Sequence, residues 1–179
     1  FPSILLKDKT YGIIGLGRIG GWVSRYALAF GMKVIAYDPW ISHWPSQVEK
    51  VDNLLDIAKS SDFFSLHVHL SDDTHNLLGK EFFQKLKVGS IFVNTSRGEL
   101  TDESALLDSL NNKQLGGAGL DVLTNEPNIS NDPLIKYSTR HSNLIITPHC
   151  GGYSPDAVCL VSKRALDKTL NFLRGTPYL

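Results

Sequence analysis

The sequence is poor in cysteine, in net charge and in long apolar runs, and each shortage excludes a class of protein. Its 2 cysteines, Cys150 and Cys159, are too few for a disulfide framework or a zinc site, which favours a reducing, cytoplasmic compartment. Lys and Arg number 18, and so do Asp and Glu, so no basic surplus is present to attract nucleic acid or an anionic membrane. No apolar run approaches the ~20 residues that span a bilayer, and the first ten residues lack the basic flank of a signal peptide.

The remaining composition is that of an ordinary folded domain. Hydrophobic residues make up 42% of the 179 residues, and charged residues make up 20%. A chain of this length and apolar content can bury a sizeable core, which excludes disorder and fibrous repeats. The sequence contains no internal repeat and no low-complexity linker, so we expect a single domain over residues 1–179.

Short β-branched or aromatic runs alternate with segments of helical period, which is typical of an α/β fold. Several runs are apolar on both faces, as strands of a parallel sheet covered by helices would be. We expect a doubly wound parallel sheet with six core strands, at residues 10–15, 33–37, 62–68, 90–94, 117–121 and 143–147. We also expect helices at 53–59, 80–87, 103–110 and 154–174, and a surface loop at 136–143.

The helix after the first strand is marked most strongly. Apolar residues recur there at helical spacing, and Gly31 follows them as a C-terminal cap residue. The recurring residues are Ile19, Trp22, Val23, Tyr26 and Phe30.

A G-x-G-x-x-G motif joins that strand to that helix. Gly15 suits the tight turn, Gly17 lets the backbone approach a pyrophosphate, and Gly20 permits close packing of helix and strand. Asp38 lies 18 residues beyond Gly20, at the end of the next strand, where it can accept hydrogen bonds from an adenosine ribose and repel a 2′-phosphate. The pattern predicts a Rossmann dinucleotide-binding fold that binds NAD in preference to NADP.

The N–H groups of Arg18 and Ile19, at the helix start, are expected to face the pyrophosphate. The sequence contains neither the G-x-x-x-x-G-K-[ST] loop of phosphoryl-transfer enzymes nor the G-x-S-x-G turn of serine hydrolases. The sequence therefore gives no motif in favour of phosphoryl transfer or of hydrolysis by a serine nucleophile.

Three polar residues follow later strands of the predicted sheet. Ligands bind beyond the carboxyl ends of the strands in such a fold, so Arg97, Glu126 and His149 are candidate site residues. An arginine that binds a carboxylate, a histidine that transfers a proton and a glutamate that holds the histidine charged form a coherent set for reducing a 2-oxo acid. Position alone leaves a loop ion pair, a solvated glutamate and an ordinary loop histidine as alternatives.

The chain from about Lys9 to Gly152 resembles the NAD-binding domain of the D-isomer-specific 2-hydroxyacid dehydrogenases. The most specific stretch is Lys87–Leu106, which reads KVGSIFVNTSRGELTDESAL. Two further signatures follow in order: Gly119–Val122 with Glu126 and Pro127, and Thr147–His149 with Gly151 and Gly152.

The resemblance implies a role for each of these residues. Arg97 would bind the substrate carboxylate, His149 would be the acid in reduction and the base in oxidation, and Glu126 would hydrogen-bond His149. Asp121 would lie near the nicotinamide carboxamide, and Val68 and Thr95 would line the cofactor cleft. A glutamate rather than an amide at Glu126 favours the hydroxyacid enzymes over the formate dehydrogenase branch.

The resemblance also implies partners and an incomplete site. We expect a small 2-hydroxy or 2-oxo acid substrate, a homodimer, and a substrate lobe that is absent from this chain, so that the domain binds NAD but is inactive alone. An NAD-sensing interaction protein, similar to the co-repressors built on this fold, is the alternative.

One departure from the family pattern concerns histidine. His69 stands where the family usually has proline, two residues after His67. Both would project to one side of a strand, which raises a metal site as an alternative, with Asp72 or His75 as further ligands. Because no third and fourth ligand is evident, we expect no metal.

Overall fold

The computed structural model describes residues 4–176. They form two compact units, one running to Thr147 and the other beginning at Pro148. The single domain over residues 1–179 stays a prediction, and the two units are described separately below.

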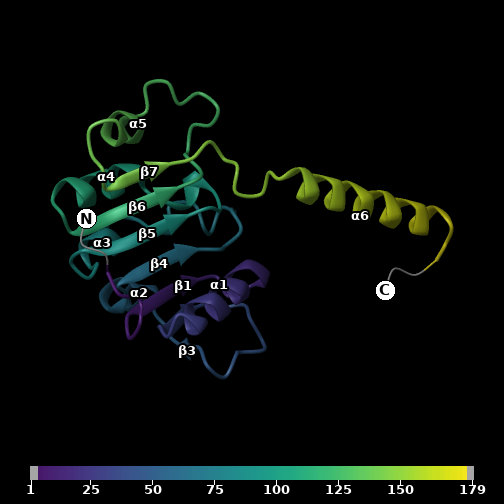
Figure 1. Cartoon of the computed structure of the whole chain (residues 1–179), viewed down its shortest axis with the longest axis horizontal. Helices are drawn as coiled ribbons and strands as arrows, with labels where there is room; N and C mark the ends of the chain where they lie inside the picture. Colours follow the sequence, from purple (N-terminus) through teal and green to yellow (C-terminus); the bar gives the residue numbers. More distant parts are fainter. Residues whose placement is uncertain (1–3, 177–179) are drawn as a thin grey trace. The chain divides into compact units, whose positions relative to one another are not determined.

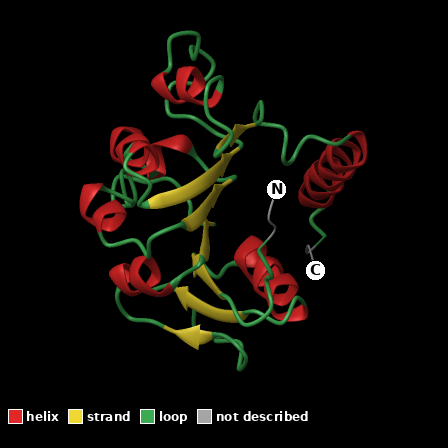
Figure 2. Ribbon diagram, turned by 60° about the vertical axis from the view of Figure 1, so that its left-hand side comes forward, coloured by secondary structure: helices red, strands yellow, loops and turns green. Residues whose placement is uncertain are grey.

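The first unit is built on a parallel sheet with helices on both faces (Figures 1 and 2). The 7 strands have the order β3-β2-β1-β4-β5-β6-β7. They are β1 (Thr10–Ile14), β2 (Lys33–Tyr37), β3 (Glu49–Lys50), β4 (Phe63–Leu66), β5 (Ser90–Asn94), β6 (Leu115–Leu120) and β7 (Leu144–Ile146). The doubly wound α/β fold is confirmed.

The helices of the first unit lie between these strands in the chain. They are α1 (Arg18–Ala29), α2 (Leu54–Ser60), α3 (Lys80–Gln84), the 3-10 helix η1 (Gly98–Leu100), α4 (Glu103–Asn111) and α5 (Pro133–Ser138). Side-chain caps fix several starts. Asp102 accepts a hydrogen bond from the Ala105 N–H at 3.0 Å, and Asp132 accepts one from the Leu134 N–H at 2.7 Å.

Several elements differ from the sequence expectation. Helix α3 ends at Gln84, three residues before the expected end at 87. β3 was not expected, because its residues Glu49 and Lys50 are both exposed and polar and form only an edge strand. The loop expected at 136–143 is helical in its first residues, because the cap Asp132 and the following Pro133 begin α5 there.

The order of the strands creates a crevice between β1 and β4. The chain proceeds from β1 to β2 and β3 on one side and then returns to β4 on the other, so connections leave β1 and β4 in opposite directions. In sheets of this type ligands bind at such a switch point, outside the carboxyl ends of the strands. The loops after β1, β2, β4 and β5 therefore contain the candidate site.

Helix α1 packs on the sheet mainly through small residues, and of its expected apolar stripe only Val23 is partly buried against the core. Gly20, Ser24 and Ala27 are its buried residues. The helix itself is confirmed, but most of the expected stripe faces outward: Ile19, Trp22, Tyr26 and Phe30 are between 56% and 65% exposed. The contact is too close for large side chains. On the other face of the sheet, α2 to α5 cover a larger core that includes Phe64, Phe82 and Phe92.

The second unit consists of a loop and one long helix, α6 (Pro155–Leu173), which Ser154 caps. This confirms the helix expected at 154–174. None of its residues is buried, and the apolar Val161, Leu166 and Phe172 are exposed. Among the described residues, no helix is long and apolar enough to cross a membrane.

Candidate cofactor and active site

The glycine motif between β1 and α1 has the close contacts that its spacing predicts. Gly15 has φ +90, and a Cβ there would lie 2.8 Å from the backbone of His67. A Cβ on Gly20 would lie 2.1 Å from the carbonyl oxygen of Gly15. A Cβ on Gly17 would have open space around it, with no atom within 4 Å. The first and third glycines therefore permit close backbone contacts, while the second leaves room beside the loop.

The start of α1 presents unpaired backbone donors toward the open space beside Gly17. Gly17 is its N-cap residue and supplies no side-chain hydrogen bond, and the first turn contains no acidic residue. Arg18 and Ile19 are the first two residues of the helix, and both are exposed. N–H groups at a helix start attract anions because they lack partners and carry the positive end of the helix dipole. This end of α1 can accept a phosphate group.

Asp38 lies across the loop, and backbone groups fix its carboxylate. Oδ2 accepts from the Leu16 N–H at 2.7 Å, and Oδ1 accepts from the N–H groups of Trp40 and Ile41 at 2.9 and 3.2 Å. Asp38 lines a cavity of about 490 Å³ together with Gly15, Gly17 and Val68. The predicted ribose-binding residue and the glycine loop thus share one cavity.

A second cavity, of about 360 Å³, lies on the other side of the segment from His67 to His69, which forms a wall between the two cavities. Arg18, Ile19, Val68, Thr95 and Arg97 line it, so five of the predicted site residues meet there. The two cavities share the segment from His67 to His69. Together they form a cleft along the carboxyl ends of β1, β4 and β5.

Buried hydrogen bonds hold the loop that carries Arg97. Asn94 is 1% exposed, donates from Nδ2 to the Arg97 carbonyl at 2.9 Å and accepts from the Ser96 N–H at 2.9 Å. The Ser96 hydroxyl donates to the Leu66 carbonyl at 2.7 Å. The Arg97 guanidinium is exposed, and Nη1 donates to the Ser96 carbonyl at 2.6 Å. The backbone is therefore fixed while the charged end of the side chain remains accessible.

The loop that carries Glu126 presses directly on the Arg97 loop. A Cβ on Gly98 would lie 2.2 Å from the carbonyl carbon of Leu123 and 2.3 Å from the nitrogen of Thr124. Glu103 accepts a hydrogen bond from the Thr124 N–H at 2.8 Å, and Glu126 accepts one from the Leu123 N–H at 2.7 Å. Burial raises the pKa of the Glu103 carboxyl. The two loops are thus held against each other at the site.

Asp121 and His149 complete the predicted set. Asp121 is 5% exposed at the end of β6, and its Oδ1 accepts a hydrogen bond from the Thr147 hydroxyl. His149 belongs to the second unit, in the loop before α6, and its backbone φ is 51. The contact between His149 and Glu126 stays a prediction.

His67 lines both cavities of the cleft. Its Nε2 lies 2.8 Å from the Ser65 hydroxyl, and burial lowers the pKa of the imidazole to about 4, so the ring is neutral at neutral pH. Within residues 4–176, no group of three or more His, Cys, Asp or Glu side chains is placed to hold a metal ion.

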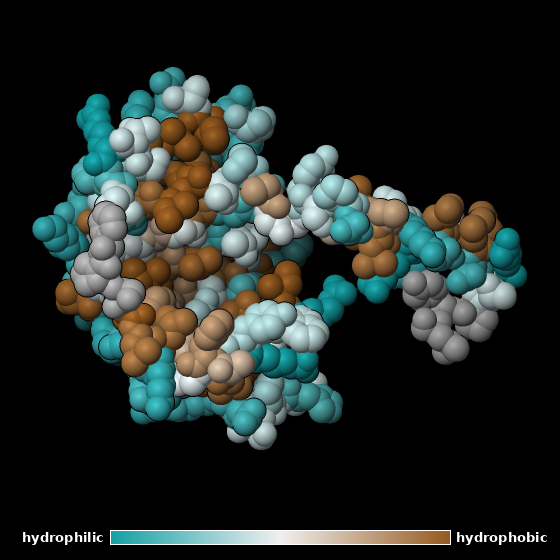
Figure 3. Space-filling model, in the orientation of Figure 1, coloured by the Kyte–Doolittle hydropathy of each residue, from teal (hydrophilic) through white to brown (hydrophobic). Residues whose placement is uncertain are grey.

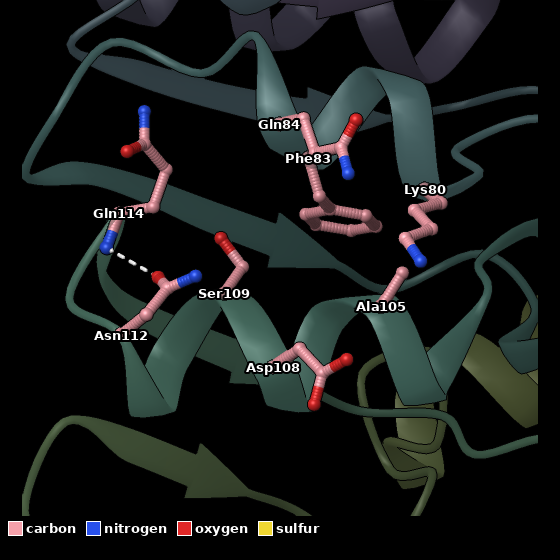
Figure 4. A pocket seen from close by; sticks show the side chains of 8 residues that line it. All are labelled: Lys80, Phe83, Gln84, Ala105, Asp108, Ser109, Asn112 and Gln114. Carbon is pink, nitrogen blue, oxygen red and sulfur yellow. Dashed lines mark hydrogen bonds between the residues drawn. The ribbon is translucent and has the colours of Figure 1, made fainter.

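A third hollow, of about 320 Å³, lies between α3 and α4. Figure 4 shows Phe83 at its centre, with polar side chains of the two helices around the ring. None of the predicted site residues lines it. The hollow lies in the helical layer, away from the carboxyl ends of the strands.

Sequence reasoning missed several residues that shape the cleft. Tyr37, Trp40 and Thr74 line the larger cavity, and Asn94 fixes the Arg97 loop. Asn94 falls inside the signature stretch, but its buried hydrogen bonds depend on the chain turning back after β5. The pairing of Gly98 with Leu123 joins distant segments and has no local signal.

Comparison with known proteins identifies the family. The model of the family "D-isomer specific 2-hydroxyacid dehydrogenase, NAD binding domain" matches residues 1–151. The glycerate dehydrogenase of Methylorubrum extorquens is 38% identical over 180 residues, covering 99% of this chain and 54% of the relative. The hydroxypyruvate reductase of Thermotoga maritima is 41% identical over 163 residues, covering 91% and 52%.

A solved structure gives the same result. D-lactate dehydrogenase from Aquifex aeolicus, complexed with NAD and lactic acid, matches with a TM-score of 0.85 and 29% identity, over 97% of this chain and 56% of that one. The chain spans between 33% and 54% of the length of the first curated relatives that it matches. The chain therefore belongs to the D-isomer-specific 2-hydroxyacid dehydrogenases, and the matched residues are the family's NAD-binding domain.

Proposed function

We propose that the chain is the cofactor lobe of an oxidoreductase that transfers a hydride between NAD(H) and a small D-2-hydroxy or 2-oxo acid. NADH, when bound, supplies the hydride that C2 of the 2-oxo acid accepts. This chain covers 54%, 33% and 52% of the length of the three relatives, so each of them is much longer than this chain. Their additional length supports a second lobe that completes the substrate cleft. In this proposal the lobe described here binds NAD and is inactive alone.

The cleft fits a dinucleotide by its shape and by its donors. Asp38 would hold the adenosine ribose in the larger cavity, beside Gly15 and Gly17. The N–H groups at the start of α1 would hold the diphosphate, and Thr95 and Val68 would line the path toward the nicotinamide end. Asp121 would lie near the nicotinamide carboxamide. The ionised Asp38 repels a 2′-phosphate, which supports NAD over NADP as the cofactor.

Arg97 and His149 would act on the substrate. The exposed Arg97 guanidinium would bind the substrate carboxylate through two parallel hydrogen bonds and polarise the adjacent carbonyl. His149 would donate a proton to the carbonyl oxygen during reduction and take it back during oxidation. Glu126 would accept a hydrogen bond from His149 and favour its charged form.

The observation that carries this proposal is the contact between two loops of the first unit. Gly98 lets the Arg97 loop pack against Leu123 and Thr124, so the carboxylate-binding arginine is held beside the loop of Glu126. The side chains of Arg97 and Glu126 are both exposed, and what supports a functional role is that buried backbone contacts fix the two loops that carry them. The geometry favours functional roles over the simpler loop alternatives.

Substitution of Arg97 and His149 tests the proposal. In the full-length enzyme, Arg97→Ala and His149→Asn should lower kcat/KM with 2-oxo acids by at least ~10²-fold, because each removes a group that acts on the transition state. NADH affinity should stay within about threefold of wild type. Lys136→Ala, on the distant helix α5, is the matched control and should change neither quantity. Near-normal turnover in either site variant would overturn the proposal.

The co-repressor alternative receives no support from the comparisons, since the relatives described above are dehydrogenases and reductases. Full-length protein that binds NADH but oxidises it with no 2-oxo acid would revive that alternative.

We also infer a homodimer in a cytoplasmic setting. Figure 3 shows apolar surface on one face of the first unit. On α1, Trp22, Tyr26 and Phe30 are exposed, and so are Ile4 and Leu5 before β1. Large exposed apolar patches usually mark an interface, and the family forms its main dimer contact through this domain. The rings of Trp22 and Tyr26 stack on each other with their centroids 6.0 Å apart, so the two side chains form one apolar surface. The low cysteine content supports the cytoplasm.

A further inference from the structure

We propose that His69 is a cofactor-binding residue of this chain and that it contacts the diphosphate of NAD. The inference rests on the proposed function and adds a residue to it. His69 takes the place of a proline that the family usually has, and neither the glycine motif nor the catalytic set accounts for it.

The place of His69 in the cleft gives the first argument. The segment from His67 to His69 lines both cavities. The larger cavity contains Asp38 for the ribose of adenosine, and the smaller contains Thr95 and Arg97 toward the substrate. A dinucleotide that occupies both must cross this shared wall. The middle of a dinucleotide is its diphosphate, so the segment that both cavities share would lie beside that group.

The chemistry of the three wall residues gives the second argument. Val68 is apolar. The His67 ring points to the Ser65 hydroxyl at 2.8 Å and is neutral at neutral pH. His69 is exposed and retains an imidazole that can donate a hydrogen bond to a phosphate oxygen. Among the shared wall residues, His69 is therefore the one suited to an anion.

The backbone around His69 is already fixed. The Thr74 hydroxyl donates to the His69 carbonyl at 2.8 Å, and Thr74 Oγ1 accepts from the Ser71 N–H at 2.8 Å. These contacts close a turn and hold the residue at the wall before any ligand binds. The start of α1, with Arg18 and Ile19, lines the smaller cavity with His69. The diphosphate would thus have donors from two separate elements.

Competition with cofactor fragments tests the proposal. NADH binding to the whole chain is followed by fluorescence, and ADP-ribose and adenosine are titrated as competitors against it. His69→Ala should weaken NADH and ADP-ribose about tenfold, because a hydrogen bond to a charged group is lost. Adenosine affinity should stay within twofold, because adenosine has no phosphate. His69→Gln keeps a donor and should recover part of the loss.

His75→Ala is the matched control, since it removes an exposed histidine from the same loop that lines neither cavity. It should leave all three affinities unchanged. Equal weakening of adenosine and ADP-ribose by His69→Ala would overturn the proposal, and so would unchanged ADP-ribose affinity. Failure of the proposed function is a separate result, in which the full-length protein binds NADH but transfers no hydride to a 2-oxo acid.

Discussion

Replacing Gly20 by alanine tests the packing on which the phosphate site depends. A Cβ at this position would lie 2.1 Å from the Gly15 carbonyl oxygen and 3.2 Å from Cγ2 of Ile13. The nearer neighbour is a backbone atom, and the Ile13 methyl belongs to a fully buried side chain, so neither can easily move away. The start of α1 would have to move by roughly 1 Å to reach van der Waals distance. That movement displaces the N–H groups proposed to bind the diphosphate.

The expected magnitude combines two opposing effects. Alanine stabilises a helix interior by about 0.5–1 kcal/mol relative to glycine. Overpacking typically costs about 1–3 kcal/mol, and backbone neighbours place this site at the upper end. We expect Gly20→Ala to lower the free energy of unfolding by about 2 kcal/mol, which lowers Tm by roughly 4–8 °C in a chain of this size. NADH should bind at least ~10-fold more weakly.

Gly21→Ala is a close control, because the next residue of the same helix has open space within 4 Å of its Cβ position. It should gain the helix propensity without the clash and raise Tm by roughly 2–4 °C. Thermal unfolding and NADH titration of the two variants measure the difference. If Gly20→Ala were as stable as Gly21→Ala and bound NADH normally, the packing argument would be refuted.

Four further predictions follow from other contacts. The wild type should bind NADH at least ~10-fold more tightly than NADPH in parallel titrations, because of the carboxylate of Asp38; equal affinities would count against this role. Because the pKa of His67 falls from 6.5 to about 4 on folding, the unfolded chain binds the additional proton and stability falls as pH drops from about 6.5 to 4. Urea unfolding of His67→Gln should show a fall in the free energy of unfolding between pH 6.5 and 4 that is smaller than in wild type by about 2–3 kcal/mol. An unchanged pH dependence would contradict the burial of the His67 ring. Asn94→Ala should cost about 2 kcal/mol in the same assay, since it removes two buried hydrogen bonds of the Arg97 loop; Asn112→Ala, at the exposed end of α4, should cost far less. Trp22→Glu should convert a dimer to a monomer in sedimentation experiments without loss of folding, whereas a wild-type monomer would contradict the proposed interface.

The strands were predictable from the sequence because apolar residues occupy most of the length of each strand. β2 and β5 coincide with the expected ranges 33–37 and 90–94. The glycine motif was also informative, because Gly15 and Gly20 each lie where a Cβ would meet backbone atoms, while Gly17 leaves open space beside the loop. By contrast, β3 depends on pairing Glu49 with Ile35 of β2, which no pattern of two polar residues can signal.

The orientation of α1 shows where periodicity is insufficient. The spacing of Trp22, Tyr26 and Phe30 correctly predicts a helix, but an apolar stripe does not say whether it faces the core or a partner. The close approach at Gly20 decides the matter, since the buried residues of α1 are the small Gly20, Ser24 and Ala27, with Val23 and Leu28 only partly buried beside them. The face of α1 that packs on the sheet is therefore set by the contact between Gly20 and Gly15, and the helical spacing of apolar residues could not predict it.

The site was predictable in its residues more than in its geometry. Resemblance and position both selected Arg97 and Glu126, and the structure places their loops in contact through Gly98. The cleft wall at His67 and His69 was visible only as a departure from the family pattern. Its role emerges from the two cavities that share it.

The central claim is hydride transfer from NADH to C2 of a small 2-oxo acid. The most direct measurement gives the full-length enzyme NADH deuterated at C4 with a panel of 2-oxo acids and analyses the products by mass spectrometry and chiral chromatography. We expect a D-2-hydroxy acid that carries deuterium at C2, formed at a rate that His149→Asn lowers by at least ~10²-fold. Tight NADH binding without deuterium transfer to any 2-oxo acid would contradict it.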